Sequence, residues 1–292
     1  ATPSTIVIEY SNHMDNKRSS QLKKQLSVTL LCIASALVFI CCSSSKEVES
    51  LSVEERFALA MNKFKEGDYL DAIEDFKIVT VQFPGSAVAD DAQFNIAECR
   101  YLRGEYILAG AEYDLLVRTM PSSPLVPKAR YMKAMSGYNL SPKPDLDQKY
   151  TREAIDDFQT YIEYSPADTL AKDAATKIAE LINKLAKKEF ENGRLYYRLE
   201  YYKAAVAYFD NVMERFHDSE YADDALLGKA RAMRDRRDYA GALEAIQLFL
   251  QKYPESDLIK EIETLKSDVE EDVASAKVAP KPSPGLSTKN AQ

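Results

Sequence analysis

Apolar residues in this chain recur at the spacing of amphipathic α-helices. One stripe follows the order i, i+3, i+4 and i+7 and consists of Phe57, Ala60, Met61 and Phe64. Another consists of Phe94, Ala97 and Tyr101. This spacing places the side chains of each stripe on one helical face. Glycine is scarce, with 9 residues among 292, and Ala, Leu, Glu and Lys are abundant. Because these residues favour helices over strands, we expect an all-α protein.

A longer repeat overlies the helical pattern. Five segments carry an alanine followed four residues later by an aromatic or apolar residue, and these alanines are Ala72, Ala109, Ala154, Ala205 and Ala242. Each segment closes with a proline, or with a histidine in its place, at Pro84, Pro121, Pro166, His217 and Pro254. Recurrence at this spacing is typical of helical repeat proteins. Alanine permits close helix packing, and proline ends the second helix of each repeat.

These features are typical of tetratricopeptide repeats, which stack into a superhelix with a concave groove. We expect about five helix-turn-helix repeats, at residues 51–84, 88–121, 126–166, 169–217 and 221–254. Repeats one and two form an N-terminal part, residues 51–121. Repeats three to five form a C-terminal part, residues 122–272, which closes with a capping helix from Asp257 to Asp272.

Three departures from regular repeats are expected along the chain. The third repeat carries a polar loop from Ser141 to Tyr150, and the fourth begins with a long helix from about Leu170 to Leu199. Residues 273–292 contain three prolines and a glycine near the end, a composition typical of a disordered tail.

The N-terminal segment resembles a lipoprotein export signal. Four basic residues precede an apolar run of 15 residues from Leu26 to Ile40, too short to span a bilayer. The run ends in Cys41 and Cys42, and Cys42 is the better lipid acceptor because a small residue precedes it. We expect residues 1–41 to be a signal region that is removed, with Met14 as the start, and residues 42–50 to be a lipidated tether. A cleaved signal without lipid is the alternative.

The repeat region offers few residues suited to catalysis or metal binding. The sequence has no nucleotide-binding, serine-hydrolase or zinc-protease motif, and its two histidines, His13 and His217, have no cysteine at ligand spacing. The net charge of −8 argues against nucleic-acid binding. We therefore predict no catalytic residue, no metal and no cofactor. The lone cysteine of the repeats, Cys99, is expected to be a small buried hydrophobic residue.

Paired aspartates recur at one phase of the repeat. They follow a serine in Ser86 to Ala92 and again in Ser219 to Ala225. Paired carboxylates can perform acid–base catalysis, but a fixed repeat phase favours another interpretation. We expect the serine or aspartate to cap the following helix, with both carboxylates near the positive end of its dipole.

Five residues on the first helices of repeats one and two form a candidate peptide-binding groove: Phe57, Met61, Phe64, Phe94 and Tyr101. An apolar groove with aromatic anchors suits an extended, aromatic-rich peptide. The same stripes also fit the repeat core, where helices pack against their neighbours.

The combination of lipid signal, short tether and five repeats resembles the BamD family, a lipoprotein component of the outer-membrane β-barrel assembly machine. The local likeness is strongest from Leu185 to Phe190, continues through Leu195-Tyr196-Tyr197, and ends at Met213 to Phe216. The resemblance covers about Cys42 to Lys266. It implies a non-enzymatic lipoprotein that is lipid-anchored to the outer membrane on its periplasmic face.

The resemblance also implies partners. The C-terminal repeats would dock on the barrel subunit BamA, alongside other assembly-complex lipoproteins, and the N-terminal repeats would receive unfolded outer-membrane proteins. Tethering would raise the effective concentration of these partners at the membrane. The alternative is another periplasmic tetratricopeptide lipoprotein that scaffolds cell-wall or division proteins.

Overall fold

The structure is a computed structural model that describes residues 51–278. The chain divides into residues 1–52 and residues 53–292, and all of the described helices lie in the second unit. We call the described part of that unit, from Val53 to Val278, the helical body. The predicted signal region, Cys42 and most of the predicted tail lie outside the described residues.

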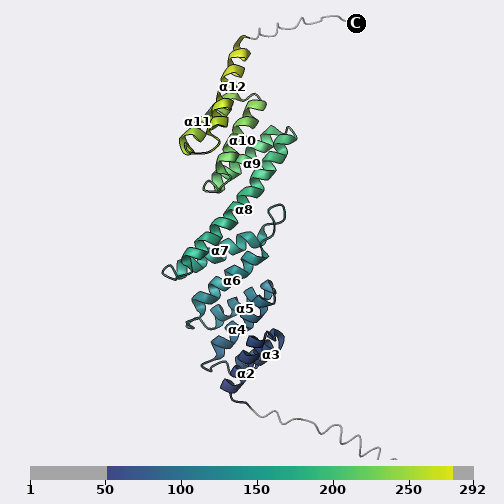
Figure 1. Cartoon of the computed structure of the whole chain (residues 1–292), viewed down its shortest axis with the longest axis vertical. Coiled ribbons are helices and arrows are strands. Elements are labelled where there is room, and N and C mark those ends of the chain that lie inside the picture. The colour runs from purple at the N-terminus through teal and green to yellow at the C-terminus, as the bar shows by residue number, and fades with distance from the viewer. Residues whose placement is uncertain (1–50, 279–292) are drawn as a thin grey trace, which may run out of the picture. The chain divides into compact units, whose positions relative to one another are not determined.

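The helical body consists of eleven α-helices, and no strand occurs among residues 51–278 (Figure 1). The helices are α2 (Val53–Glu66), α3 (Tyr69–Gln82), α4 (Ala89–Leu102), α5 (Tyr106–Thr119), α6 (Val126–Leu140), α7 (Lys149–Tyr164), α8 (Ala171–Arg198), α9 (Tyr202–Arg215), α10 (Ala222–Asp235), α11 (Tyr239–Lys252) and α12 (Ile259–Val278). Each helix packs against the next along the chain. The prediction of an all-α tetratricopeptide-repeat fold is confirmed.

The helices pair as the sequence predicted. α2 pairs with α3, α4 with α5, α6 with α7, α8 with α9, and α10 with α11, and α12 follows as the capping helix. The long helix that opens the fourth repeat is α8, with 28 residues. The capping helix continues to Val278, past the predicted end at Asp272, because the alanines and the lysine that follow favour helix.

A buried glutamine orders the loop of the third repeat. The side-chain amide of Gln148 donates to the backbone carbonyls of Lys143 (2.7 Å) and Leu146 (3.0 Å), and its oxygen accepts from the hydroxyl of Thr151 (2.7 Å). Thr151 in turn shares a 2.7 Å hydrogen bond with Ser141 at the start of the loop. The loop is therefore held by a continuous hydrogen-bonded network, which satisfies its buried polar groups.

The turn inside four of the repeats uses one residue in the left-handed backbone region. These residues are Gly67 (φ 87°), Gly104 (φ 76°), Glu200 (φ 62°) and Arg237 (φ 65°). Glycine adopts this conformation without strain, whereas other residues are disfavoured there. In the first two turns the glycine is followed by an acidic residue and a tyrosine, and the other two turns lack the glycine.

An aromatic pair spans three of these turns. The rings pair as Phe64–Tyr69, Tyr101–Tyr106 and Tyr197–Tyr202, with centroids 5.7, 5.3 and 5.7 Å apart. In each pair, the first ring ends one helix and the second ring begins the next. The first two pairs meet edge to face and the third is tilted, and each pair adds to the apolar burial between the two helices of its repeat.

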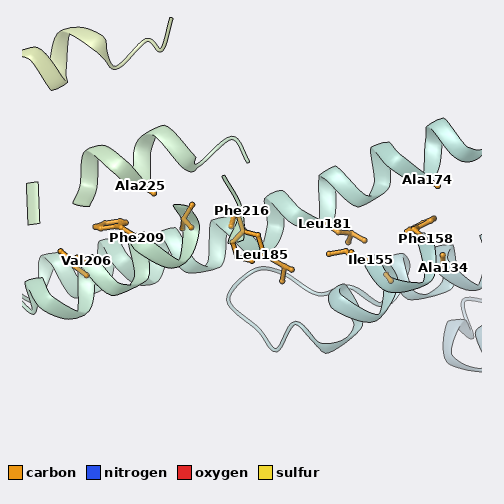
Figure 2. Close-up of a cluster of buried hydrophobic side chains, with 14 of the residues drawn as sticks. Ala134, Ile155, Phe158, Ala174, Leu181, Leu185, Val206, Phe209, Phe216 and Ala225 are labelled. Carbon is orange, nitrogen blue, oxygen red and sulfur yellow. The ribbon is translucent and has the colours of Figure 1, made fainter. Parts of the chain in front are cut away.

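The repeated alanines lie where helices cross. All five are fully buried: Ala72, Ala109, Ala154, Ala205 and Ala242. A continuous apolar cluster extends along α8, from Phe158 and Leu181 to Phe209 (Figure 2). The expected burial of Cys99 is confirmed, because it is fully buried and its burial raises the pKa of the thiol to about 12.

The serines that precede the paired aspartates do not cap the next helix, so that part of the capping interpretation is wrong. Neither α4 nor α10 has a side-chain cap, and the hydroxyls of Ser86 and Ser219 are buried without a hydrogen-bond partner. The aspartates do lie in the first helical turn, as expected. Asp90 accepts from the backbone N–H of Asp91 (3.0 Å), which satisfies one free donor of the helix.

Candidate peptide-binding surface

The predicted groove residues on α2 are half-buried. Phe57, Met61 and Phe64 pack against the apolar cluster of the first repeat. The ring of Phe57 lies 5.6 Å from that of Phe76, which is fully buried. Each of the three residues therefore belongs partly to the core and keeps an accessible edge.

The two predicted groove residues on α4 differ from each other. Phe94 is only 6% exposed and packs on the ring of Tyr113 at 5.5 Å, so it belongs mainly to the core. Tyr101 is half-buried, and its hydroxyl accepts a hydrogen bond from Asn139 on α6 (2.8 Å). Phe94 and Tyr101 contact a different apolar cluster from the α2 residues. The five residues thus follow two neighbouring helices and do not converge on one point.

A hollow that the sequence interpretation missed lies between α8 and α10. It has a volume of about 500 Å³. Its walls include the aromatic residues Phe190 and Tyr197, the aliphatic Leu227, and three arginines, Arg194, Arg198 and Arg231. We call this hollow the α8–α10 cleft. The arginines on α8 are four residues apart, which places them on one helical face and is the sequence signal that could have revealed them.

The floor of the α8–α10 cleft is the ring of Phe209, which extends from α9. A Cβ atom added to Gly193 on α8 would lie 2.6 Å from Cε1 of this ring, and one added to Gly228 on α10 would lie 2.7 Å from Cζ. Both separations are far below van der Waals contact. The two glycines therefore allow the Phe209 ring to lie between the helices, and larger residues would displace it.

Tyrosine–carboxylate hydrogen bonds join the first helices of successive repeats. Tyr138 on α6 donates to Glu180 on α8 (2.5 Å), and Tyr197 on α8 donates to Asp235 on α10 (2.5 Å). Burial and the bonded carboxylate together raise the pKa of Tyr197 to about 12. The tyrosine therefore remains protonated at physiological pH and keeps its donor role.

Arginines continue this series from α10 to α12. Arg234 donates to Asp268 (2.9 Å) and to Asp272 (2.8 Å), and Arg231 pairs with Glu261. These groups border a second hollow of about 320 Å³, which shares Tyr197 and Arg231 with the α8–α10 cleft. The capping helix is thus joined to the last repeat by charge-assisted hydrogen bonds.

The acidic side chains of the helical body do not gather into a metal-binding group. Among residues 51–278, no group of three or more His, Cys, Asp and Glu side chains is placed to hold a metal ion. No helix in the same range is both long and apolar enough to cross a bilayer.

Comparisons with known proteins identify both the type of repeat and the family. Residues 224–256 match the tetratricopeptide repeat, so the chain is a tetratricopeptide-repeat protein by both structure and sequence. Residues 50–234 match the YfiO family, described as outer membrane lipoprotein. Because this match covers more than half of the chain, the protein belongs to that outer membrane lipoprotein family.

Curated relatives include proteins named outer membrane protein assembly factor BamD. The one from Haemophilus influenzae is 27% identical over 216 residues, which cover 70% of this chain and 82% of the relative. Those from Pasteurella multocida and Neisseria meningitidis serogroup B are 24% and 22% identical, over 77% and 80% of this chain and 91% and 93% of the relatives. The similarity to these proteins thus spans most of both chains.

Proposed function

We propose that this protein is an assembly factor for outer-membrane proteins that works by binding other proteins. The observation that carries the proposal is the match of residues 50–234 to the outer membrane lipoprotein family, together with relatives named as assembly factors. An array of helical repeats offers extended surface for proteins and peptides, which suits a scaffold. In this proposal the protein performs no catalysis.

In this proposal, the N-terminal and C-terminal repeats of the helical body bind different partners. The first helices of repeats one and two would receive unfolded outer-membrane proteins. Support comes from Phe57, Met61, Phe64 and Tyr101, which are half-buried and keep aromatic or apolar edges accessible. Phe94 would support this surface from below, because it is almost fully buried. Such edges bind apolar side chains of an extended chain without requiring one sequence.

Repeats three to five would dock on a BamA-like barrel subunit and on other lipoproteins of the complex. Cross-repeat hydrogen bonds and ion pairs from α6 to α12 support this role, because they hold the repeats in one arrangement. A preorganised surface loses less conformational entropy on binding than a mobile one.

A lipid on Cys42 would anchor the protein to the outer membrane, with the helical body on the periplasmic face. Support comes from the family description and from the signal-like sequence that precedes Cys42. Anchoring confines the repeats near the membrane and raises their effective concentration toward membrane-bound partners. The mechanism therefore consists of tethering and delivery, and it requires no nucleotide.

The proposal is tested by purifying the tagged, full-length protein from detergent-solubilised outer membrane and identifying its partners by mass spectrometry. We expect a large barrel protein with periplasmic repeat domains among the recovered proteins. Recovery of cell-wall synthases or division proteins without a barrel subunit would instead favour the alternative scaffold function. Cys42→Ala is the matched variant for the anchor, and we expect it in the soluble periplasmic fraction.

A further inference from the structure

Two polar contacts recur between successive repeats of the helical body. In the first contact, a side chain near the end of one helix bonds to a side chain 38 residues later, and the pairs are Tyr101–Asn139, Tyr197–Asp235 and Arg234–Asp272. In the second contact, a serine bonds to an aspartate 33 residues earlier, and the pairs are Ser123–Asp90 and Ser256–Asp223. These bonds add directional contacts to the apolar packing between repeats.

The junction between repeats one and two lacks both contacts. At the first position it has Phe64 and Leu102, which are also 38 residues apart but have no polar side-chain atom. At the second position, Val53 stands 33 residues before Ser86, and the hydroxyl of Ser86 is buried without a hydrogen-bond partner. A buried hydroxyl without a partner weakens the contact that buries it, because its hydration is lost without replacement.

The charged side chains in the middle of repeat one bond to each other. Arg56 and Lys63 on α2 both pair with Asp75 on α3, at 3.0 and 2.7 Å. Among the described residues from Arg56 to Gly85, no side chain makes a hydrogen bond or an ion pair with repeat two. The contact of repeat one with α4 is instead apolar packing, on Ala92, Ile96 and Cys99.

The later junctions keep polar contacts even where one of the two is missing. Ser219 has Ala186 33 residues before it, and its hydroxyl is also buried without a partner. The same junction, between repeats four and five, retains the bond from Tyr197 to Asp235, and a second bond of 3.0 Å joins α8 to Glu220. At the other end of the helical body, Arg234 binds two aspartates of α12.

We propose that repeat one opens from repeat two as one cooperative unit, because their junction lacks these bonds, while repeats two to five and the capping helix remain folded. In a repeat array, an end repeat is held by its own stability and by one junction. The ion pairs of Asp75 keep α2 and α3 together during this motion. Opening uncovers the face of α4 that carries Ile96 and Cys99. The motion goes beyond the proposed function, because it follows from the junctions and not from any partner.

Hydrogen exchange of the purified full-length protein in detergent tests the proposal. Mass spectrometry measures the exchange at several urea concentrations below the unfolding transition. We expect peptides of α2 and α3 to exchange through one shared opening, with the same dependence on urea. Peptides of α5 to α11 should have protection factors at least about 10-fold higher. Peptides of α12 up to Asp272 should also be protected more than those of α2, because Arg234 bonds this helix to α10.

A double variant supplies the missing bond. Phe64→Tyr with Leu102→Asn places in the first junction the pair that Tyr101 and Asn139 form in the second. Phe64 is half-buried and Leu102 is 51% exposed, so neither substitution fills a packed space. We expect the protection of α2 and α3 to rise about 5-fold, the effect of one hydrogen bond. Leu102→Asn alone is the matched control, because it supplies only half of the pair, and we expect protection like that of the unaltered protein.

Four results would overturn the proposal. Two concern repeat one: exchange of α2 and α3 only together with the rest of the helical body, and exchange of α2 while α3 stays protected. The third is lower protection of α12 than of α2, and the fourth is equal protection of α2 and α3 in the double variant and in Leu102→Asn. The exchange experiment involves no partner protein, so its result is independent of the purification of partners from outer membrane.

Discussion

Ser123, in the turn that leads into α6, donates a 2.6 Å hydrogen bond to Asp90 in the first turn of α4. The same bond recurs between Ser256 and Asp223 at 2.7 Å, again 33 residues apart. Each serine also accepts a hydrogen bond from a backbone N–H two residues later, at Leu125 or Leu258. One aspartate thus joins the beginning of its own repeat to the beginning of the next.

We expect Asp90→Ala and Ser123→Ala each to destabilise the helical body by about 1–2 kcal/mol, because the bond is charge-assisted and partly buried. The double variant should cost less than the sum of the two, since both remove the same contact. Urea denaturation followed by circular dichroism measures these values. Ser122→Ala is the control, because Ser122 is exposed in the same turn. Strict additivity would show that the bond does not contribute.

The two turns without glycine should be strained. Glu200 and Arg237 have φ angles of 62° and 65°, which cost roughly 1 kcal/mol for a residue with a Cβ. We therefore expect Glu200→Gly and Arg237→Gly each to raise the free energy of unfolding by up to about 1 kcal/mol. Gly104→Ala should lower it by a similar amount, since Gly104 has φ 76°. Thermal denaturation of the three variants shows whether each substitution raises or lowers the free energy of unfolding. A destabilised Glu200→Gly protein would contradict this explanation.

The buried thiol of Cys99 should react slowly and should make stability depend on pH at the alkaline end. Burial raises the pKa of this thiol to about 12, so the folded protein retains a proton that the unfolded chain loses at a lower pH. This contribution to stability is fully present below about pH 8.5 and is lost as the pH rises toward 12.

Alkylation by iodoacetamide at pH 8, followed by peptide mass spectrometry, measures the reactivity of Cys99 directly. We expect little modification of the folded protein and complete modification in urea. In Cys99→Ala the alkaline loss of stability should become shallower. Rapid modification of Cys99 under native conditions would show that the thiol is accessible.

Phe64→Asp tests the N-terminal surface. Phe64 is half-buried, with its ring 5.7 Å from that of Tyr69. We expect this substitution to weaken binding of peptides from unfolded outer-membrane proteins by about 10-fold while the helical circular dichroism signal is retained. Loss of the helical signal would instead assign Phe64 to the core. Leu70→Asp is the comparison, because Leu70 is 56% exposed and is not one of the predicted groove residues.

Residue pattern alone predicted most of this fold. The alanine phase located the helix crossings, and the closing prolines located the ends of the repeats, because both depend on local sterics. The pattern could not show that Asp90 bonds to Ser123, since that contact depends on how successive repeats stack. The pattern also did not predict the left-handed backbone at Glu200 and Arg237. There, tertiary packing imposes a positive φ that these residues themselves disfavour.

The candidate sites were harder to predict than the fold. A stripe of apolar residues has the same spacing whether it faces a groove or the core, so Phe94 and Tyr101 could not be distinguished before the structure placed one at 6% exposure and the other half-buried. The α8–α10 cleft depends on Gly193 and Gly228, which are 35 positions apart and meet only at the ring of Phe209.

Photo-crosslinking in living cells tests the proposed assembly function most directly. A photoreactive phenylalanine analogue replaces Met61 on α2 in one strain and the exposed Arg198 on α8 in another, each in the full-length protein. We expect position 61 to crosslink newly made outer-membrane proteins. We expect position 198 to crosslink a resident partner of the assembly complex. Crosslinks from both positions to cell-wall or division proteins only, with no outer-membrane protein at either, would contradict the proposed function.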